Sequence, residues 1–145
     1  MSFYDNLKDY MILNDVKIQD ISKATDIEDS VLYDYAKGSI PNIEHAVKLA
    51  NYMNCTLNYL MGIDEEANNS KFKSTYDISL FSNRYDNLLK ENKVAHYRLC
   101  KEKGLNYSSH YAWQHGAKPS MSSLIIIAQY FDVSIDYLVG RSDNK

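Results

Sequence analysis

The sequence predicts an all-α protein made of two small five-helix domains joined by a polar linker. Three observations carry this prediction: the chain repeats itself, its apolar residues recur at helical spacing, and helix-capping residues border the periodic segments. Of its 145 residues 45% are hydrophobic, which is typical of a globular protein. This length allows one ordinary domain or two small ones.

The repeat is clearest in two segments that lie 78 positions apart. NYMNCTLNYLMG ends at Gly62 and QYFDVSIDYLVG ends at Gly140, with tyrosines, a leucine and a glycine at matching places. The same offset aligns earlier positions without a gap, beginning with Phe3 and Phe81. A register that holds over about sixty positions indicates a duplicated structural unit.

Between the copies, residues 64–77 read DEEANNSKFKSTYD, which is polar and has little apolar periodicity. This composition predicts a linker. We therefore expect a first domain at 1–63, the linker at 64–77 and a second domain at 78–145. A flexible coil of this length spans about 20 Å on average. The sequence leaves open whether the domains lie side by side or act at separate places.

Within each copy the apolar residues follow the period of a helix, beginning with residues 3–11 in the first copy and 81–89 in the second. Four residues are placed to cap later helices at their amino ends: Asn42, Thr56, Ser120 and Ser134. Gly62 and Gly140 are expected to end the short last helix of each copy. No alternating apolar stretch lies between hairpin turns, so we expect almost no strand.

Several classes of protein are not expected. The longest apolar run, 124–128, is too short to cross a bilayer, and the amino terminus lacks the pattern of a secretory signal. Cys55 and Cys100 have no CxxC partner, so we expect a cytoplasmic protein without a disulfide framework or a metal site. The four histidines show no metal-binding spacing, and no nucleophile motif or phosphate-binding loop occurs. We predict no catalytic residue and no cofactor.

One stretch of each copy resembles a known family. The first copy reads VKIQDISKATDIEDSVLYDYAKGSIPNIEHAVKLANYMNCTLNYLMG, and the second reads VAHYRLCKEKGLNYSSHYAWQHGAKPSMSSLIIIAQYFDVSIDYLVG. Both resemble the Cro/cI-like (Xre-type) helix-turn-helix domains of phage repressors and bacterial regulators, which implies a lambda-repressor-like fold. It also implies a recognition helix that enters the major groove of double-stranded DNA. Asp26 and Gly104 stand at the turn before that helix, where a left-handed backbone is needed.

The two copies differ in charge although their patterns match. Residues 1–64 hold five lysines and ten acids, for a formal charge of −5. Residues 78–145 hold nine lysines and arginines and six acids, for a charge of +3. Because a DNA-binding surface must neutralise phosphates, we expect the second copy to bind DNA. In the first copy Glu28, Asp29 and Asp34 would repel the phosphate backbone, although acids at a helix start also favour the helix dipole.

The resemblance assigns DNA contacts residue by residue. The expected contacts in the second copy are His96, Tyr97, Asn106, Tyr107, Ser108, Tyr111, His115 and Lys118. Weaker contacts are assigned in the first copy to Gln19, Ser30, Tyr33 and Lys37. In this assignment His96 touches backbone phosphate and Asn106 caps the recognition helix. No arginine occupies a reading position, so we expect modest affinity or reliance on DNA shape.

His110 departs from the pattern, because the first copy has Leu32 at the matching place. A partly buried, hydrogen-bonded histidine and a slightly rotated helix are both open.

Two functions compete. The first is a DNA-binding transcriptional regulator, a repressor in the phage style, that reads DNA with the second copy. Its acidic first domain would form a homodimer or hold a protein partner. The alternative is a protein–protein interaction module on a helix-turn-helix scaffold that no longer binds DNA.

Overall fold

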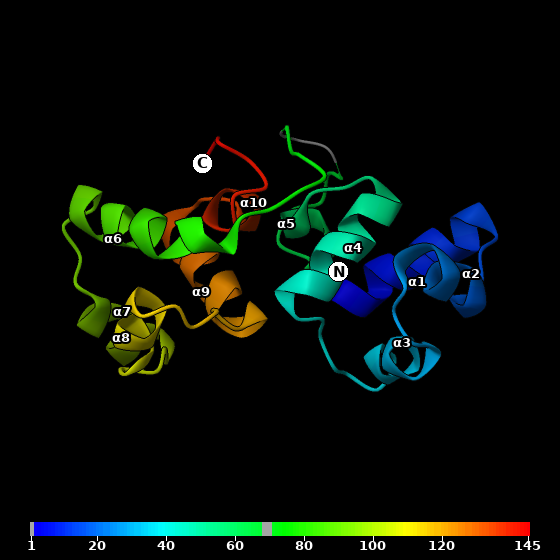
Figure 1. Cartoon of the computed structure of the whole chain (residues 1–145), viewed down its shortest axis with the longest axis horizontal. Coiled ribbons are helices and arrows are strands. Elements are labelled where there is room, and N and C mark those ends of the chain that lie inside the picture. Colours follow the sequence, from blue (N-terminus) through cyan, green and yellow to red (C-terminus); the bar gives the residue numbers. More distant parts are fainter. Residues whose placement is uncertain (1, 68–70) are drawn as a thin grey trace. The chain divides into compact units, whose positions relative to one another are not determined.

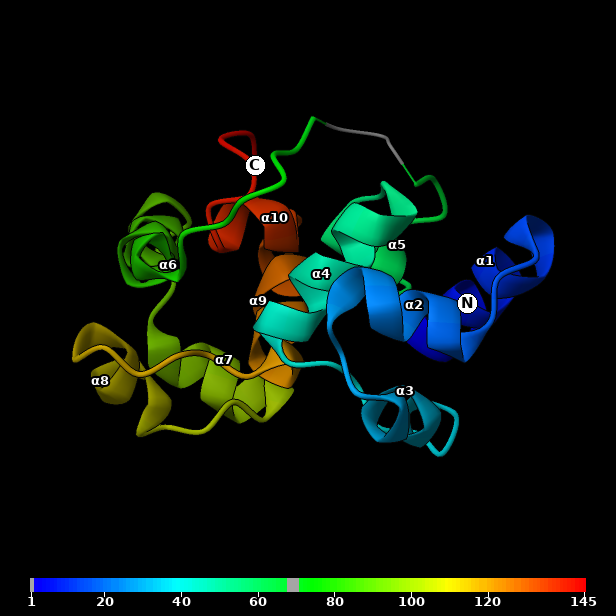
Figure 2. The ribbon, with the colours of Figure 1, turned by 45° about the vertical axis from the view of Figure 1, so that its right-hand side comes forward.

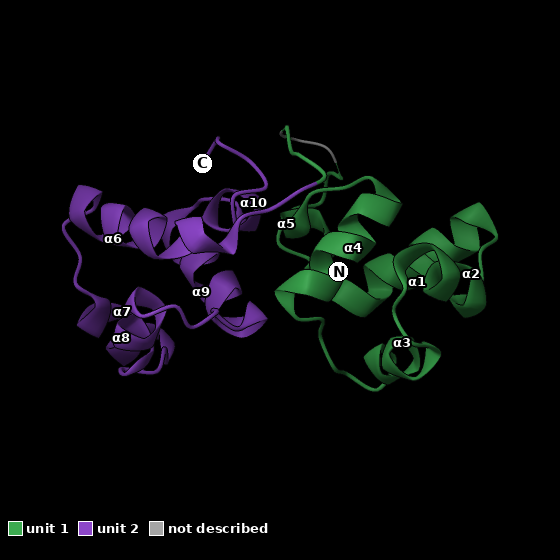
Figure 3. Cartoon of the chain, in the orientation of Figure 1, with its two compact units in different colours: residues 1–74 green, residues 75–145 purple. Residues whose placement is uncertain are grey.

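The computed structural model describes residues 2–67 and 71–145 of the chain. In these residues it contains ten α-helices, one short 3-10 helix and no strand (Figures 1 and 2). The prediction of an all-α protein is confirmed. The chain divides into two compact units, residues 1–74 and 75–145 (Figure 3). No helix in the described part is long and apolar enough to span a membrane.

Both units present their helices in the same order. The first unit contains α1 (Phe3–Asn14), α2 (Ile18–Thr25), α3 (Asp29–Tyr35), α4 (Ile43–Met53) and α5 (Leu57–Leu60). The second contains η1 (Ile78–Leu80), α6 (Phe81–Glu91), α7 (His96–Lys103), α8 (Ser109–Gln114), α9 (Met121–Phe131) and α10 (Ile135–Leu138). Moving α2, α4 and α5 along the chain by 78 positions gives the bounds of α7, α9 and α10.

The backbone turns repeat as closely as the helices. Every positive-φ residue in the described chain has a counterpart 78 positions away: Asp15 with Lys93, Asp26 with Gly104, Gly38 with Gly116, Asn54 with Asp132, and Gly62 with Gly140. At the turn after the second helix, φ is 60° for Asp26 and 78° for Gly104. The expected left-handed turn is therefore present in both units, and the aspartate adopts it at a higher energetic cost than the glycine.

The four expected amino-terminal caps are confirmed. In each case the side-chain oxygen accepts a hydrogen bond from the backbone N–H three residues further on. The caps are Asn42 of α4, Thr56 of α5, Ser120 of α9 and Ser134 of α10. Each satisfies a backbone donor that the first turn of a helix leaves without a partner.

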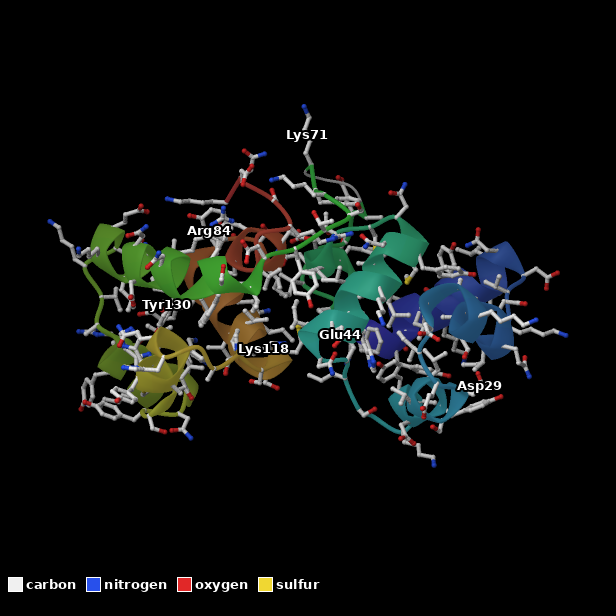
Figure 4. All side chains as sticks on the ribbon, viewed as in Figure 1. Asp29, Glu44, Lys71, Arg84, Lys118 and Tyr130 are labelled. Carbon is white, nitrogen blue, oxygen red and sulfur yellow. The ribbon has the colours of Figure 1, made fainter. Side chains whose placement is uncertain are left out.

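A side chain from the first helix of each unit also holds the carbonyl end of the last helix. Asn6 Nδ2 donates to the Tyr59 carbonyl at 2.8 Å. Arg84, at the matching position, donates from Nη1 to the carbonyls of Tyr137 and Ser142, the latter at 2.8 Å. These bonds satisfy carbonyl groups that helix ends leave unpaired. Figure 4 labels Arg84 on α6.

Each unit has a hydrophobic core of its own. An aromatic residue of the third helix packs edge-on against the phenylalanine that opens the first helix. Tyr35 meets Phe3 and Trp113 meets Phe81, with ring centroids 5.0 Å apart in both pairs. Tyr35 is 2% exposed and Trp113 is 6% exposed, so both serve the core and neither offers a ring for base stacking.

The segment 64–77, expected as a linker, is bonded to the units at both ends. The Thr56 amide donates to the carbonyl of Ala67 at 2.9 Å. The Asp77 amide donates to the backbone carbonyl that follows α10 at 2.7 Å. Residues 68–70 of the expected linker lie outside the described residues.

Candidate nucleic-acid interface

In the second unit α7 and α8 are joined by a tight turn, as α2 and α3 are in the first unit. Leu99 of α7 and Leu105 of the turn are buried and anchor the motif on the core. Asn106 Oδ1 accepts hydrogen bonds from the Ser108 amide at 3.0 Å and from its hydroxyl at 2.8 Å. Asn106 therefore stabilises the turn, and the expectation that it caps the recognition helix is wrong, because Ser108 is the residue that precedes α8. Regular helix begins at Ser109, two positions later than in the first unit.

Seven of the eight residues predicted to contact DNA in this unit lie at the surface. Tyr97, Tyr107 and Tyr111 are 60%, 71% and 68% exposed, which is unusual for such large rings. The other exposed members are Asn106, Ser108, His115 and Lys118. The turn and α8 therefore present aromatic rings and hydroxyls to solvent, and Lys118 follows on the loop before α9 (Figure 4).

The structure corrects the expectation for His96. Its side chain is only 7% exposed, which leaves no surface for a phosphate. Its Nδ1 lies 2.7 Å from the hydroxyl of Tyr85, and its Nε2 lies 3.3 Å from the carbonyl of Asn106. His96 thus lies inside the unit, and its hydrogen bonds link α7 to α6 and to the turn.

The bonding of His96 defines its neutral form. A carbonyl only accepts hydrogen bonds, so Nε2 carries the proton and Nδ1 accepts from Tyr85. Burial raises the pKa of Tyr85, which keeps that hydroxyl protonated. Burial also lowers the pKa of His96, and the nearby His110 lowers it further, whereas the hydrogen bond to the Asn106 carbonyl raises it. The neutral imidazole therefore satisfies both of its partners.

His110 is a partly buried, hydrogen-bonded residue, the first of the two readings that its position left open. Its Nε2 lies 2.7 Å from Oδ1 of Asp86 on α6. Its ring centroid is 4.7 Å from that of His96. Gln114 Nε2 donates to the other Asp86 oxygen at 3.4 Å. Asp86 thereby holds α8 against α6.

Asp86 and Tyr85 lie next to the candidate interface, and they were not predicted from the sequence. A signal was available in the repeat, because three polar core residues replace apolar ones at matching places. The pairs are Tyr85 with Leu7, His96 with Ile18, and His110 with Leu32. Comparing the copies position by position would have indicated a polar cluster beneath α8.

In the first unit the matching surface is acidic. The predicted weaker contacts Gln19, Ser30, Tyr33 and Lys37 are all exposed. Glu28, Asp29 and Asp34 are exposed as well, and Figure 4 labels Asp29 on α3. The Nζ of Lys37 lies 4.0 Å from Asp34, with both side chains mostly in solvent. Such a pair is weak and leaves the face negative.

Comparison with known proteins finds similarities in part of the chain. Residues 7–60, which include α2 and α3, match the model of a helix-turn-helix family. The chain is 30% identical over 66 residues to an uncharacterised HTH-type transcriptional regulator, YobD, of Bacillus subtilis (strain 168). That match covers 45% of this chain and 59% of the relative. No solved structure gives a significant match.

The family match falls on the acidic unit, whereas the sequence favoured the basic unit for DNA binding. A match of this kind describes the scaffold, and the binding surface has to be argued from its own side chains. The described residues contain no group of three or more histidines, cysteines or acids that could hold a metal ion.

Proposed function

We propose that the protein is a cytoplasmic DNA-binding transcriptional regulator, a repressor, that places α8 of its second domain in the major groove. The proposal rests on the contrast in charge between two units whose helices and turns match. Residues 78–145 combine a formal charge of +3 with an exposed motif surface, whereas the first unit exposes three acids at the matching place. The helix-turn-helix match and the name of the relative support the class of protein.

The positive charge of the second unit is available for phosphates. Arg141 is fully buried and bonds to Asp136, which is also buried, so this pair adds nothing to the surface charge. The lysines on or beside the motif are exposed: Lys93, Lys101, Lys103 and Lys118. In this proposal they neutralise phosphates while Tyr107, Ser108 and Tyr111 face the bases.

In this proposal the first domain is not the main DNA-binding domain. Its exposed acids suit a basic surface of another protein or of a second copy of this chain better than a phosphate backbone. We assign to it a homodimer contact or a protein partner, with weak DNA contacts at most.

Three alanine variants test the division of labour, with binding to a mixed-sequence duplex followed by fluorescence anisotropy at low salt. Lys118→Ala should weaken binding several-fold and reduce the slope of log K against log salt by about 1, because one phosphate contact is lost. Tyr107→Ala should weaken binding without that change in slope. Asp29→Ala in the first domain serves as the control and should leave binding unchanged or slightly stronger.

Equal losses in all three variants would contradict the assignment of binding to the second domain. A loss confined to Asp29→Ala would contradict it as well, and would place the contact in the first domain.

The overall charge of −3 and the acidic first unit favour one alternative, a protein-interaction module that no longer binds DNA. Non-specific DNA affinity is almost wholly electrostatic. Complete absence of binding to random duplex at low salt would therefore support the interaction module and end the proposal of a DNA-binding regulator.

A further inference from the structure

The motif surface of the second unit exposes aromatic rings. Tyr97, Tyr107 and Tyr111 are the large hydrophobic side chains that are exposed among the described residues 75–145. Tyr107 lies in the turn before α8, and Tyr111 lies on α8. A soluble protein gains nothing in stability from exposing such rings, and exposed apolar surface often marks a binding site.

Two of these rings lie beside histidines. The Tyr111 ring stacks on His115, with centroids 4.0 Å apart and planes 25° apart, and His115 Nδ1 lies 2.8 Å from the Tyr111 carbonyl. The Tyr107 ring lies 6.4 Å from that of His96, which is itself fixed by the Tyr85 hydroxyl. Rings that are already ordered lose less entropy on binding.

Several polar side chains of this segment are hydrogen-bonded within the protein. Ser108 Oγ donates to Asn106, and both His110 and Gln114 bond to Asp86. No lysine or arginine occurs between residues 104 and 114. The bidentate donors that recognise guanine are therefore missing from this segment. The side-chain surface that this segment can place against base edges is mainly aromatic, together with the small side chain of Ala112.

In the major groove the apolar group that distinguishes one base pair from another is the C5-methyl of thymine. We propose that Tyr107 and Tyr111 recognise thymine methyl groups, so that the preferred DNA carries thymine at the positions facing these rings. This inference rests on the proposed function, and it names the base chemistry that the second domain selects. The surrounding lysines supply affinity that does not depend on the methyl group.

Four short duplexes of alternating sequence isolate the methyl group: A·T, A·U, G·C, and G·C with 5-methylcytosine. Uracil lacks the methyl of thymine, and 5-methylcytosine carries a methyl at the same place in the groove. The intact protein should bind the methylated member of each pair more tightly, by about fourfold for each methyl group buried. The readout is the ratio of the two dissociation constants within each pair.

Variants of the two tyrosines separate the ring from the hydroxyl. Tyr107→Phe and Tyr111→Phe should keep the methyl ratio, whereas Tyr107→Ala and Tyr111→Ala should bring it close to one. Lys118→Ala is the matched control, since it should weaken binding to all four duplexes equally and leave the ratio unchanged. Circular dichroism of each variant checks that the helices are retained.

The outcomes are distinguishable. Binding to all four duplexes with equal affinity would overturn this inference and leave the proposed function standing. Tighter binding to single strands than to any duplex would overturn it too, because the rings would then stack on unpaired bases. Failure to bind any duplex would end both the inference and the proposed function.

Discussion

Gly140→Ala should destabilise the second unit by about 3 kcal/mol, whereas Gly104→Ala should cost about 1 kcal/mol. Both glycines adopt a left-handed backbone, with φ of 76° and 78°, so the conformational strain of an alanine is nearly the same. The surroundings differ. A Cβ on Gly140 would lie 2.9 Å from the carbonyl oxygen of Asp77 and 3.0 Å from Leu80 Cδ1, while one on Gly104 meets nothing within 4 Å.

The larger cost comes from a contact that joins the two ends of the second unit. The Asp77 amide donates to the carbonyl of Val139 at 2.7 Å, directly beside Gly140. An alanine there pushes the Asp77 backbone away and weakens this bond. Urea unfolding followed by fluorescence measures the loss in the second unit alone, because Trp113 is the single tryptophan of the chain. Equal losses for the two variants would show that backbone strain, and not crowding, sets the cost.

His96→Ile should destabilise the second unit by about 2 kcal/mol near pH 8. Isoleucine is the residue at the matching place of the first unit, Ile18, so it suits the local helix. It leaves the fully buried hydroxyl of Tyr85 without its partner, which lies 2.7 Å away in the native protein. Adding Tyr85→Leu removes that hydroxyl and reproduces Leu7 of the first unit. The double variant should therefore regain part of the lost stability.

The same substitution should reduce the sensitivity of the second unit to acid. Burial lowers the pKa of His96 in the folded protein below its unfolded value of about 6.5. The unfolded chain then binds more protons as the pH falls, so this contribution to stability is complete above about 6.5 and is lost as the pH drops through the folded pKa.

His110 and Asp86 lie near His96 on α8 and α6. The rings of Tyr85, Tyr107 and Trp113 also surround it. His110 lowers the pKa of His96 and Asp86 raises it, and burial remains the leading cause of the lowered pKa. Tryptophan-detected unfolding between pH 7 and 5 should show a shallower decline for His96→Ile than for the native protein. Parallel declines would mean that His96 does not carry the acid sensitivity.

Local patterns predicted the helical scaffold in detail. Helix caps such as Asn42 and Ser134 act on backbone groups three residues away, and the left-handed turns at Asp26 and Gly104 depend on the residue in the turn. Interactions of this range are encoded in short stretches of sequence. The predicted surface residues were exposed for a related reason, since the helical period separates polar from apolar positions.

The buried polar contacts could not be predicted in this way. Asp86 and His110 are 24 residues apart, and Arg84 reaches carbonyl groups 53 and 58 residues further along the chain. Such pairs become neighbours only when separate helices pack, and no local period indicates them. His96 shows the consequence, because its place at the start of a helix suggested a phosphate contact while packing turned it toward Tyr85.

The sequence by itself determined the duplication, the helical class, the caps and turns, and the opposite charges of the two units, because these depend on composition and on short-range order. Only the tertiary structure decided which polar side chains are engaged inside the protein and which rings remain at the surface. That division depends on how α6, α7 and α8 pack together, and it leaves the rings of Tyr107 and Tyr111 exposed.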